Sequence, residues 1–323
     1  MSKQDRVLSG IQPSGTLHIG NYFGMMKPAI ELQEKHECYY FIADLHALTT
    51  TPDADELRER VKNVALDFLA CGLDPEKVVL FRQSDIPEVP LLTWILSCLA
   101  PLGLLERCHS YKDKVAKGIT PNHGLFSYPV LMAADILVYD STIVPVGRDQ
   151  KQHVEVTRDL AQKFNNRYGE TLRVPESSIR DEVAVVPGVD GQKMSKSYDN
   201  IIELFGPEKK MRKKIMSIKT DSTPMEDPKN PDTCNVFALY KLFADEGEIA
   251  QMRANYEGGN YGYGHAKQAL FEKYWAYFAE ARERREQLVR DNLVEDLLRQ
   301  GAEKARETAT AVLDRAMRAV GLR

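Results

Sequence analysis

The sequence predicts an α/β protein in which a doubly wound parallel sheet is followed by a C-terminal all-helical domain. Short apolar runs alternate with helical patterns as far as about residue 200, as in βαβ units. Beyond that point the β-branched runs disappear and helical patterns take over. We therefore expect a first domain at 1–200, with an inserted connection around 104–140, and a helical domain at 201–323.

Each expected strand is a short apolar run that ends at a turn or a polar loop. Strands are expected at 6–11, 38–43, 78–81, 143–146 and 183–186. Helices are expected between them at 19–32, 57–69, 91–99, 128–139 and 150–168, and in the second domain at 208–218, 236–243, 265–289 and 294–320. In such a sheet ligands bind at the carboxyl ends of the strands.

The composition is that of an ordinary globular protein, with 43% hydrophobic and 28% charged residues. The net charge of −4 implies that a nucleic-acid partner would be met by a local basic patch and not by the whole surface. The five cysteines form no CxxC pair, so we expect neither a metal site nor a disulfide framework. No apolar stretch approaches the roughly 18 residues of a membrane span, and we expect a cytoplasmic protein.

The first segment with chemical potential lies between the first strand and the first helix. It contains Gln12, Pro13, Ser14 and, after three residues, His18-Ile19-Gly20-Asn21. Small residues, free N–H groups at a helix N-terminus and an imidazole suit the phosphates of ATP. An ordinary turn with a solvated histidine is the alternative.

The second such segment is Lys193-Met194-Ser195-Lys196-Ser197, which follows the glycine-containing stretch 188–191. Ammonium and hydroxyl groups on a mobile loop can follow charge as it builds on a leaving phosphate group. A solvated charged turn is the alternative for this string alone. The presence of both strings, in this order along the chain, favours a nucleotide site.

Together the two strings resemble the HIGH and KMSKS signatures of class I aminoacyl-tRNA synthetases. The second matches at every position, whereas Asn21 replaces the last histidine of the first, a variant familiar in the tryptophan and tyrosine branch. The resemblance implies a Rossmann-like catalytic domain, a helical anticodon-binding domain, and a reaction that uses ATP, Mg²⁺ and tRNA. His18, Lys193 and Lys196 would be catalytic.

Segments 9–24, 44–49, 128–137 and 144–153 resemble the tryptophan-specific members of this branch, and the similarity extends over nearly the whole chain. The resemblance implies L-tryptophan and tRNA(Trp) as substrates, and a homodimer. Rival interpretations are a tyrosine-specific member, a synthetase-like tRNA-binding module, and another nucleotidyltransferase.

Asp135 is the residue most informative about specificity. It is the one charged residue in the apolar run 131–138, where a carboxylate is costly to bury unless something donates to it. A solvent-facing or arginine-paired acid is the alternative. The resemblance implies that Asp135 accepts the indole N–H. By the same resemblance, the remaining residues of the tryptophan pocket are Met132, Val144 and Val146 as apolar walls, Tyr128 and Gln150 at the amino group, and His46 nearby.

The resemblance assigns further residues to ATP. Lys114 would be a fourth catalytic residue at the phosphates, although Lys112 and Lys117 are close enough in sequence to take its place. The remaining candidates for ATP binding are Gly147, Arg148, Asp149 and Val185. Asp149 could instead cap the helix that follows it.

The helical domain offers two further observations. The run 209–214 is the densest basic patch, suited either to tRNA phosphates or to a solvated helix face. Some members of the branch carry four cysteines for an iron-sulfur cluster, but Cys234 is the only cysteine in this domain. We therefore expect no iron-sulfur cluster.

Overall fold

The computed structural model describes residues 5–50, 53–108, 116, 118, 120, 122–147, 150–179 and 186–323. Within these ranges a five-stranded parallel sheet has the strand order β3-β2-β1-β4-β5. The strands are β1 (Arg6–Ile11), β2 (Glu37–Ile42), β3 (Val78–Arg82), β4 (Ile143–Val146) and β5 (Glu176–Ile179). The predicted doubly wound α/β fold is therefore confirmed, and the order reverses between β1 and β4.

Helices cover both faces of the sheet. The elements of this part are α1 (Ile19–Asn21), the π-helical turn η1 (Tyr22–Met26), α2 (Lys27–Leu32), α3 (Asp44–Ala47), α4 (Ala54–Ala70), the 3-10 turn η2 (Gln83–Asp85), α5 (Glu88–Ser97), α6 (Leu102–Glu106), α8 (His123–Leu137) and α9 (Lys151–Tyr168). Along β2 the side chains alternate: Tyr40 packs into the core on the α4 side, and Tyr39 and Phe41 pack on the α5 and α8 side.

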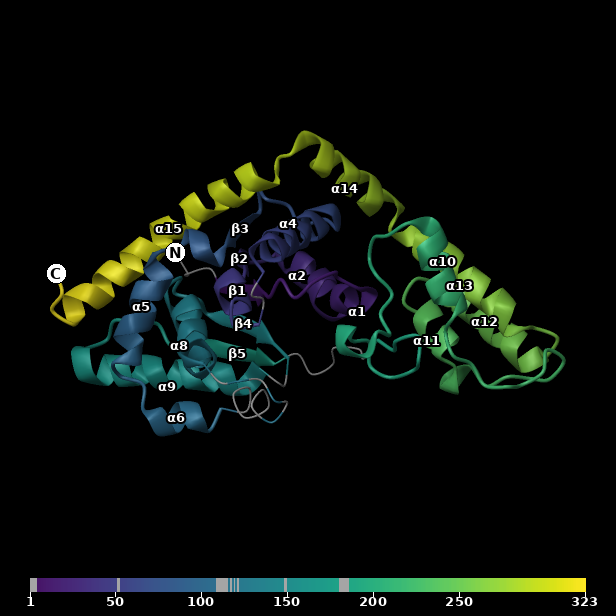
Figure 1. Ribbon diagram of the computed structural model, residues 1–323, viewed down its shortest axis with the longest axis horizontal. Coiled ribbons are helices and arrows are strands. Elements are labelled where there is room, and N and C mark those ends of the chain that lie inside the picture. Colours follow the sequence, from purple (N-terminus) through teal and green to yellow (C-terminus); the bar gives the residue numbers. More distant parts are fainter. Residues whose placement is uncertain are drawn as a thin grey trace.

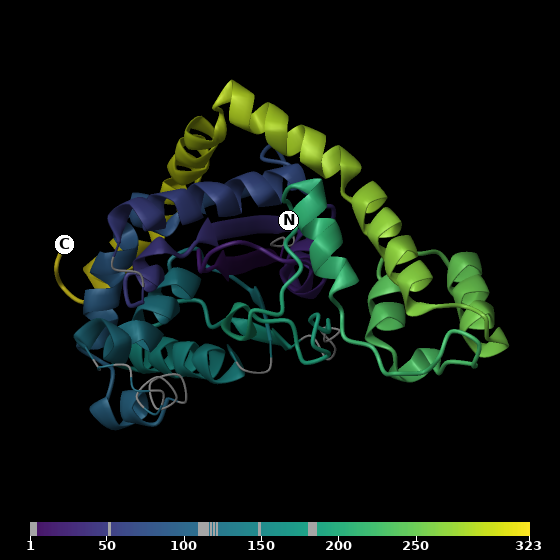
Figure 2. The ribbon, with the colours of Figure 1, turned by 45° about the vertical axis from the view of Figure 1, so that its right-hand side comes forward.

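The second half of the chain is helical, as predicted. Its elements are the 3-10 turn η4 (Lys196–Tyr198), α10 (Glu208–Met216), the 3-10 turn η5 (Pro231–Thr233), α11 (Asn235–Tyr240), α12 (Glu246–Gly258), α13 (Tyr263–Tyr277), α14 (Ala279–Asp291) and α15 (Val294–Ala319). Helices α10 to α13 lie beside the sheet on the side of α1, and α14 and α15 arch back over it (Figure 1; Figure 2).

Helix α15 packs directly on β3 and α5, so the C-terminus lies beside the first domain (Figure 1). Gly301 permits this approach, because a Cβ atom there would lie 1.8 Å from the carbonyl oxygen of Leu80. Arg306 and Thr310 on α15 donate hydrogen bonds to the buried carboxylate of Glu88 at the start of α5. The last helix, which the sequence prediction placed in the helical domain at 201–323, thus packs against the first domain.

One predicted element differs from the structure, and another falls mostly outside the described residues. The single helix expected at 265–289 is wrong: Phe278 separates α13 from α14, and its buried ring packs edge-on against Tyr22 at 5.0 Å. The strand expected at 183–186 falls mostly outside the described residues. Among the described residues the sheet has a strand that was not predicted, the polar segment Glu176–Ile179, which pairs with β4.

Candidate functional site

A cavity of about 300 Å³ opens at the carboxyl ends of β1 and β4, where the strand order reverses. This is the position at which doubly wound sheets bind ligands. Its lining brings together predicted residues that are far apart in the sequence: Gln12, His46, Tyr128, Met132, Asp135, Val144, Val146, Gly147 and Gln150. Apolar side chains from Leu8, Met25, Phe41 and Ile136 complete most of the wall.

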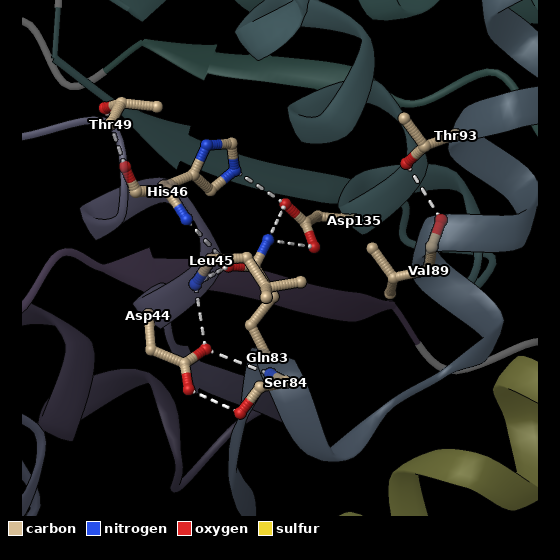
Figure 3. Close-up of polar contacts among 9 residues, drawn as sticks. All are labelled: Asp44, Leu45, His46, Thr49, Gln83, Ser84, Val89, Thr93 and Asp135. Carbon is tan, nitrogen blue, oxygen red and sulfur yellow. Dashed lines mark hydrogen bonds and ion pairs between the residues drawn. The ribbon is translucent and has the colours of Figure 1, made fainter. Parts of the chain in front are cut away.

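Asp135 lies on α8 with only 1% of its surface exposed, so the solvated alternative is wrong. Two side chains hold its carboxylate (Figure 3). Gln83 Nε2 lies 2.9 Å from Oδ1 and 2.8 Å from Oδ2, and His46 Nε2 lies 2.9 Å from Oδ2. Burial raises the pKa of Asp135, and the contacts with His46 and Gln83 oppose that rise.

The ring of His46 defines the chemistry beside Asp135. Since a carboxylate oxygen accepts, His46 Nε2 carries the proton. Its Nδ1 is buried and has no hydrogen-bond partner among the described residues. Because a buried N–H group without an acceptor is costly, this nitrogen carries a lone pair and not a second proton. The ring centroids of His46 and Tyr128 lie 4.1 Å apart, and burial, followed by the charge of Asp135, raises the pKa of Tyr128 to about 12.

A second cavity, of about 760 Å³, adjoins the first at Met25. Its lining includes residues from both sequence strings: Ser14, His18, Gly20, Asn21, Lys193, Met194, Ser195, Lys196 and Ser197. The two strings, more than 170 residues apart in the chain, therefore face one space. Pro13 is buried between Gln12 and Ser14 and is not among the residues that line either cavity.

His18 and Asn21 form a capping box at the start of α1. The backbone N–H of Asn21 donates to His18 Nδ1 at 3.2 Å, and the backbone N–H of His18 donates to Asn21 Oδ1 at 3.2 Å. Burial, followed by the charge of Lys196, lowers the pKa of His18 to about 4. His18 is therefore a neutral imidazole with its proton on Nε2, and that proton can be donated to an anion.

Lys196 docks on the first string. Its Nζ donates to the carbonyl oxygen of Ser14 at 3.2 Å and to the Ser14 hydroxyl at 3.4 Å. Burial, followed by the charge of Arg60, lowers the pKa of Lys196 to about 8. Both of these hydrogen-bond acceptors are neutral oxygens, so a charged phosphate oxygen would be a stronger partner for the ammonium group.

The family model for tRNA synthetases class I (W and Y) matches residues 2–279. The chain belongs to the class I tRNA synthetases of this family. A tryptophan–tRNA ligase of Rhodopirellula baltica is 59% identical over 98% of this chain and 100% of its own length. A tryptophanyl-tRNA synthetase of Campylobacter jejuni, solved with ADP and tryptophan, is 52% identical with a TM-score of 0.95, covering 98% of this chain and 99% of its own.

The synthetase of Mycoplasma pneumoniae for tryptophan is 33% identical with a TM-score of 0.81, and 98% of each chain is covered. The resemblance predicted from the two strings is thus confirmed. This chain is an aminoacyl-tRNA synthetase, a ligase, and tRNA is one of its substrates. Among the described residues of the synthetase, no helix is both long and apolar enough to cross a membrane.

Sequence reasoning missed three polar residues that support the synthetase's cavities. Gln83, on η2, directly follows β3, and its place at a strand end was the one available signal. His153 lies one turn after Gln150 and donates to Gln150 Oε1 from Nδ1 at 2.7 Å. Asn200 is 1% exposed and holds the segment that carries Lys193 to Ser195. No sequence pattern indicated it.

Four predicted site residues lie outside the described part of the synthetase. These are Lys114 and, for ATP, Arg148, Asp149 and Val185. Their roles stay predictions, and Lys112 and Lys117, the alternatives to Lys114, lie outside it as well.

Proposed function

We propose that this chain is a tryptophan–tRNA ligase, which activates L-tryptophan with ATP and transfers the aminoacyl group to tRNA(Trp). The buried carboxylate of Asp135, in the wall of an apolar cavity that adjoins the lysine-bearing string, carries the proposal. Relatives named for this reaction, matched along nearly their full length, support it.

Asp135 is suited to one further donor. A carboxylate offers about four acceptor positions. Within the part of the chain that the structure describes, Gln83 and His46 take three of them, two at Oδ2 and one at Oδ1, which leaves Oδ1 with room for one more N–H group. Indole has one donor and no acceptor, so tryptophan would complete the set, while phenylalanine would leave the second acceptor position of Oδ1 unfilled.

The rest of the cavity fits the remainder of the amino acid. Met132, Val144 and Val146 would pack against the indole ring. Tyr128 and Gln150 would hold the amino group, with Gln150 oriented by His153. The carboxylate of the substrate would then point toward the adjoining cavity, where the triphosphate of ATP would lie.

In the first step a carboxylate oxygen of tryptophan attacks the α-phosphorus of ATP, and the bond from that phosphorus to the bridging oxygen of pyrophosphate breaks. His18 Nε2–H, Lys193 and Lys196 would stabilise the negative charge that builds on the phosphate oxygens, with Lys114 as a predicted fourth donor. Mg²⁺ would enter bound to the phosphates of ATP. In the second step a terminal hydroxyl of tRNA takes the acyl group and AMP leaves.

Tryptophan-dependent exchange of pyrophosphate into ATP tests the first step. Lys193→Ala and Lys196→Ala should each lower the exchange rate by about 10²- to 10³-fold, as loss of a transition-state donor does. Lys209→Ala, which removes an exposed lysine on α10, is the matched control and should exchange like the natural protein. Unchanged exchange in both lysine-loop variants would refute the assigned roles.

We also propose a homodimer in the cytoplasm. Leu91 and Trp94 share one face of α5 with Cys98, which caps the helix, and Trp94 is 68% exposed, as is Leu102 on α6. Large exposed apolar side chains of this kind are typical of protein–protein contacts.

The basic run on α10 would contact tRNA. Lys210 and Lys214 pair with Glu203 and Asp199, whereas Lys209 and Lys213 are exposed on one face of the helix. Within the proposed anticodon-binding domain these two lysines are available to phosphate groups, and their binding would weaken with rising salt.

A further inference from the structure

Gln83 is a buried polar residue for which the reaction as described has no use. It is 1% exposed, begins η2 at the carboxyl end of β3, and is not among the residues that line the amino-acid cavity. A side chain amide in such a place needs partners for its donors and its acceptor. Those partners are Asp135 and the backbone of α3.

The orientation of the Gln83 carboxamide is fixed. Its Oε1 accepts from the backbone N–H of Leu45 at 3.1 Å and of His46 at 3.3 Å. A flipped carboxamide would turn N–H toward N–H at both contacts. Nε2 must therefore face Asp135, where it reaches both carboxylate oxygens (Figure 3).

A second carboxylate braces the same two segments. Asp44 Oδ1 accepts from the backbone N–H groups of Leu45 and Ser84, both at 3.0 Å, and Asp44 Oδ2 accepts from the Ser84 hydroxyl. Asp44 thus ties α3 to η2, the elements that carry His46 and Gln83. These protein contacts hold the two donors to Asp135 relative to each other (Figure 3).

We propose that Gln83 is a positioning residue for amino-acid selection: it holds the Asp135 carboxylate so that Oδ1 faces the ring N–H of the substrate. The inference rests on the proposed recognition of indole by Asp135. Without Gln83, the contact to His46 is the one that Asp135 keeps among the described residues, and the carboxylate can rotate about it, so its free acceptor position is no longer directed. Preference for an N–H-bearing ring then falls even though Asp135 is intact.

The test compares tryptophan with the analogue in which sulfur replaces the ring N–H, both measured by pyrophosphate exchange on the same samples. Gln83→Met removes the donor at similar length. We expect kcat/KM for tryptophan to fall about 10- to 100-fold, mainly through KM for tryptophan, since a hydrogen bond to a charged group is lost. KM for ATP should not change. The ratio of kcat/KM for tryptophan to kcat/KM for the analogue should fall together with kcat/KM for tryptophan.

Asn165→Leu is the matched control. Asn165 is also buried, and its Oδ1 likewise accepts from two backbone N–H groups, of Thr171 and Leu172, far from the cavity. The Asn165→Leu protein should lose about as much stability as Gln83→Met but keep the natural ratio of kcat/KM for tryptophan to kcat/KM for the analogue. If Gln83→Met does not fold, Gln83→Asn replaces it with the same expected loss of ratio, because the shorter amide cannot reach Asp135 while it accepts from the backbone of Leu45 and His46.

Asp135→Asn separates this inference from the proposed function. If the Gln83 variants keep the natural ratio while the ratio collapses in Asp135→Asn, the positioning role of Gln83 is overturned and the recognition of indole by Asp135 stands. A natural ratio in Asp135→Asn overturns the proposed recognition itself.

Discussion

Replacing Asn200 by alanine should detach the lysine-bearing string from its support. Asn200 Oδ1 accepts from the backbone N–H of Ser195 at 2.7 Å, and Nδ2 donates to Asp190 Oδ1 at 2.8 Å and to the carbonyl oxygen of Lys193 at 3.1 Å. Gly188 lies so close that a Cβ atom there would meet the Asn200 amide at 2.4 Å. The asparagine side chain is therefore the centre around which residues 188–195 fold.

The size of the effect follows from these three contacts. At a net 0.5–1.5 kcal/mol each, they stabilise the docked arrangement by about 1.5 to 4.5 kcal/mol. If Lys193 and Lys196 act only from that arrangement, the rate of adenylate formation falls by about tenfold to 10³-fold, at roughly 1.4 kcal/mol for each factor of ten. KM for tryptophan should not change, because Asn200 is not among the residues that line the amino-acid cavity.

Single-turnover formation of tryptophanyl-adenylate is the suitable assay, since it reports the chemical step without product release. Asn230→Ala is the control: it removes an exposed asparagine that caps η5 in the helical region, and it should react at the natural rate. A folded Asn200→Ala protein that forms adenylate as fast as the natural one would refute the reasoning.

Three further predictions concern stability and assembly. The free energy of unfolding should fall as the pH drops from about 6.5 to about 4, because the unfolded chain binds a proton that folded His18 resists, and His18→Gln should lose less over this range in urea titrations. Equal losses of unfolding free energy in the natural and His18→Gln proteins would contradict this prediction. Gly301→Ala should destabilise the protein by about 1–3 kcal/mol by forcing α15 off β3. Gly258→Ala is the control and should not destabilise the protein in this way, because its Cβ would meet nothing within 4 Å. Equal urea midpoints for the Gly301→Ala and Gly258→Ala proteins would count against the packing of α15 on β3. Trp94→Asp should convert the proposed dimer to a monomer in sedimentation velocity, and a monomeric natural protein would exclude the dimer.

Local patterns were sufficient to predict most of the sheet and the two nucleotide strings. The strands at 6–11 and 143–146 have the predicted bounds, because buried parallel strands are short, continuous apolar runs. The strand β5 was missed since its sequence, Glu-Ser-Ser-Ile, is mostly polar, and the break at Phe278 was missed since it depends on packing against Tyr22. Tertiary contacts decide both.

The site shows the same division. Asp135 was identifiable because an acid in an apolar run is conspicuous in the sequence. Its donor Gln83 was not, since a glutamine 52 positions away carries no sign of its partner. Asn200 was also beyond prediction, because its three contacts involve an ordinary polar residue in an ordinary loop sequence.

The most direct test of the central claim is pyrophosphate exchange by the natural protein with tryptophan, tyrosine and phenylalanine in parallel, repeated with Asp135→Asn. We predict that kcat/KM for tryptophan exceeds that for phenylalanine by about 10⁴ or more, as in sites built around one buried hydrogen bond, and that Asp135→Asn removes most of this difference. Preferential use of tyrosine, or an unchanged preference in Asp135→Asn, would contradict the claim.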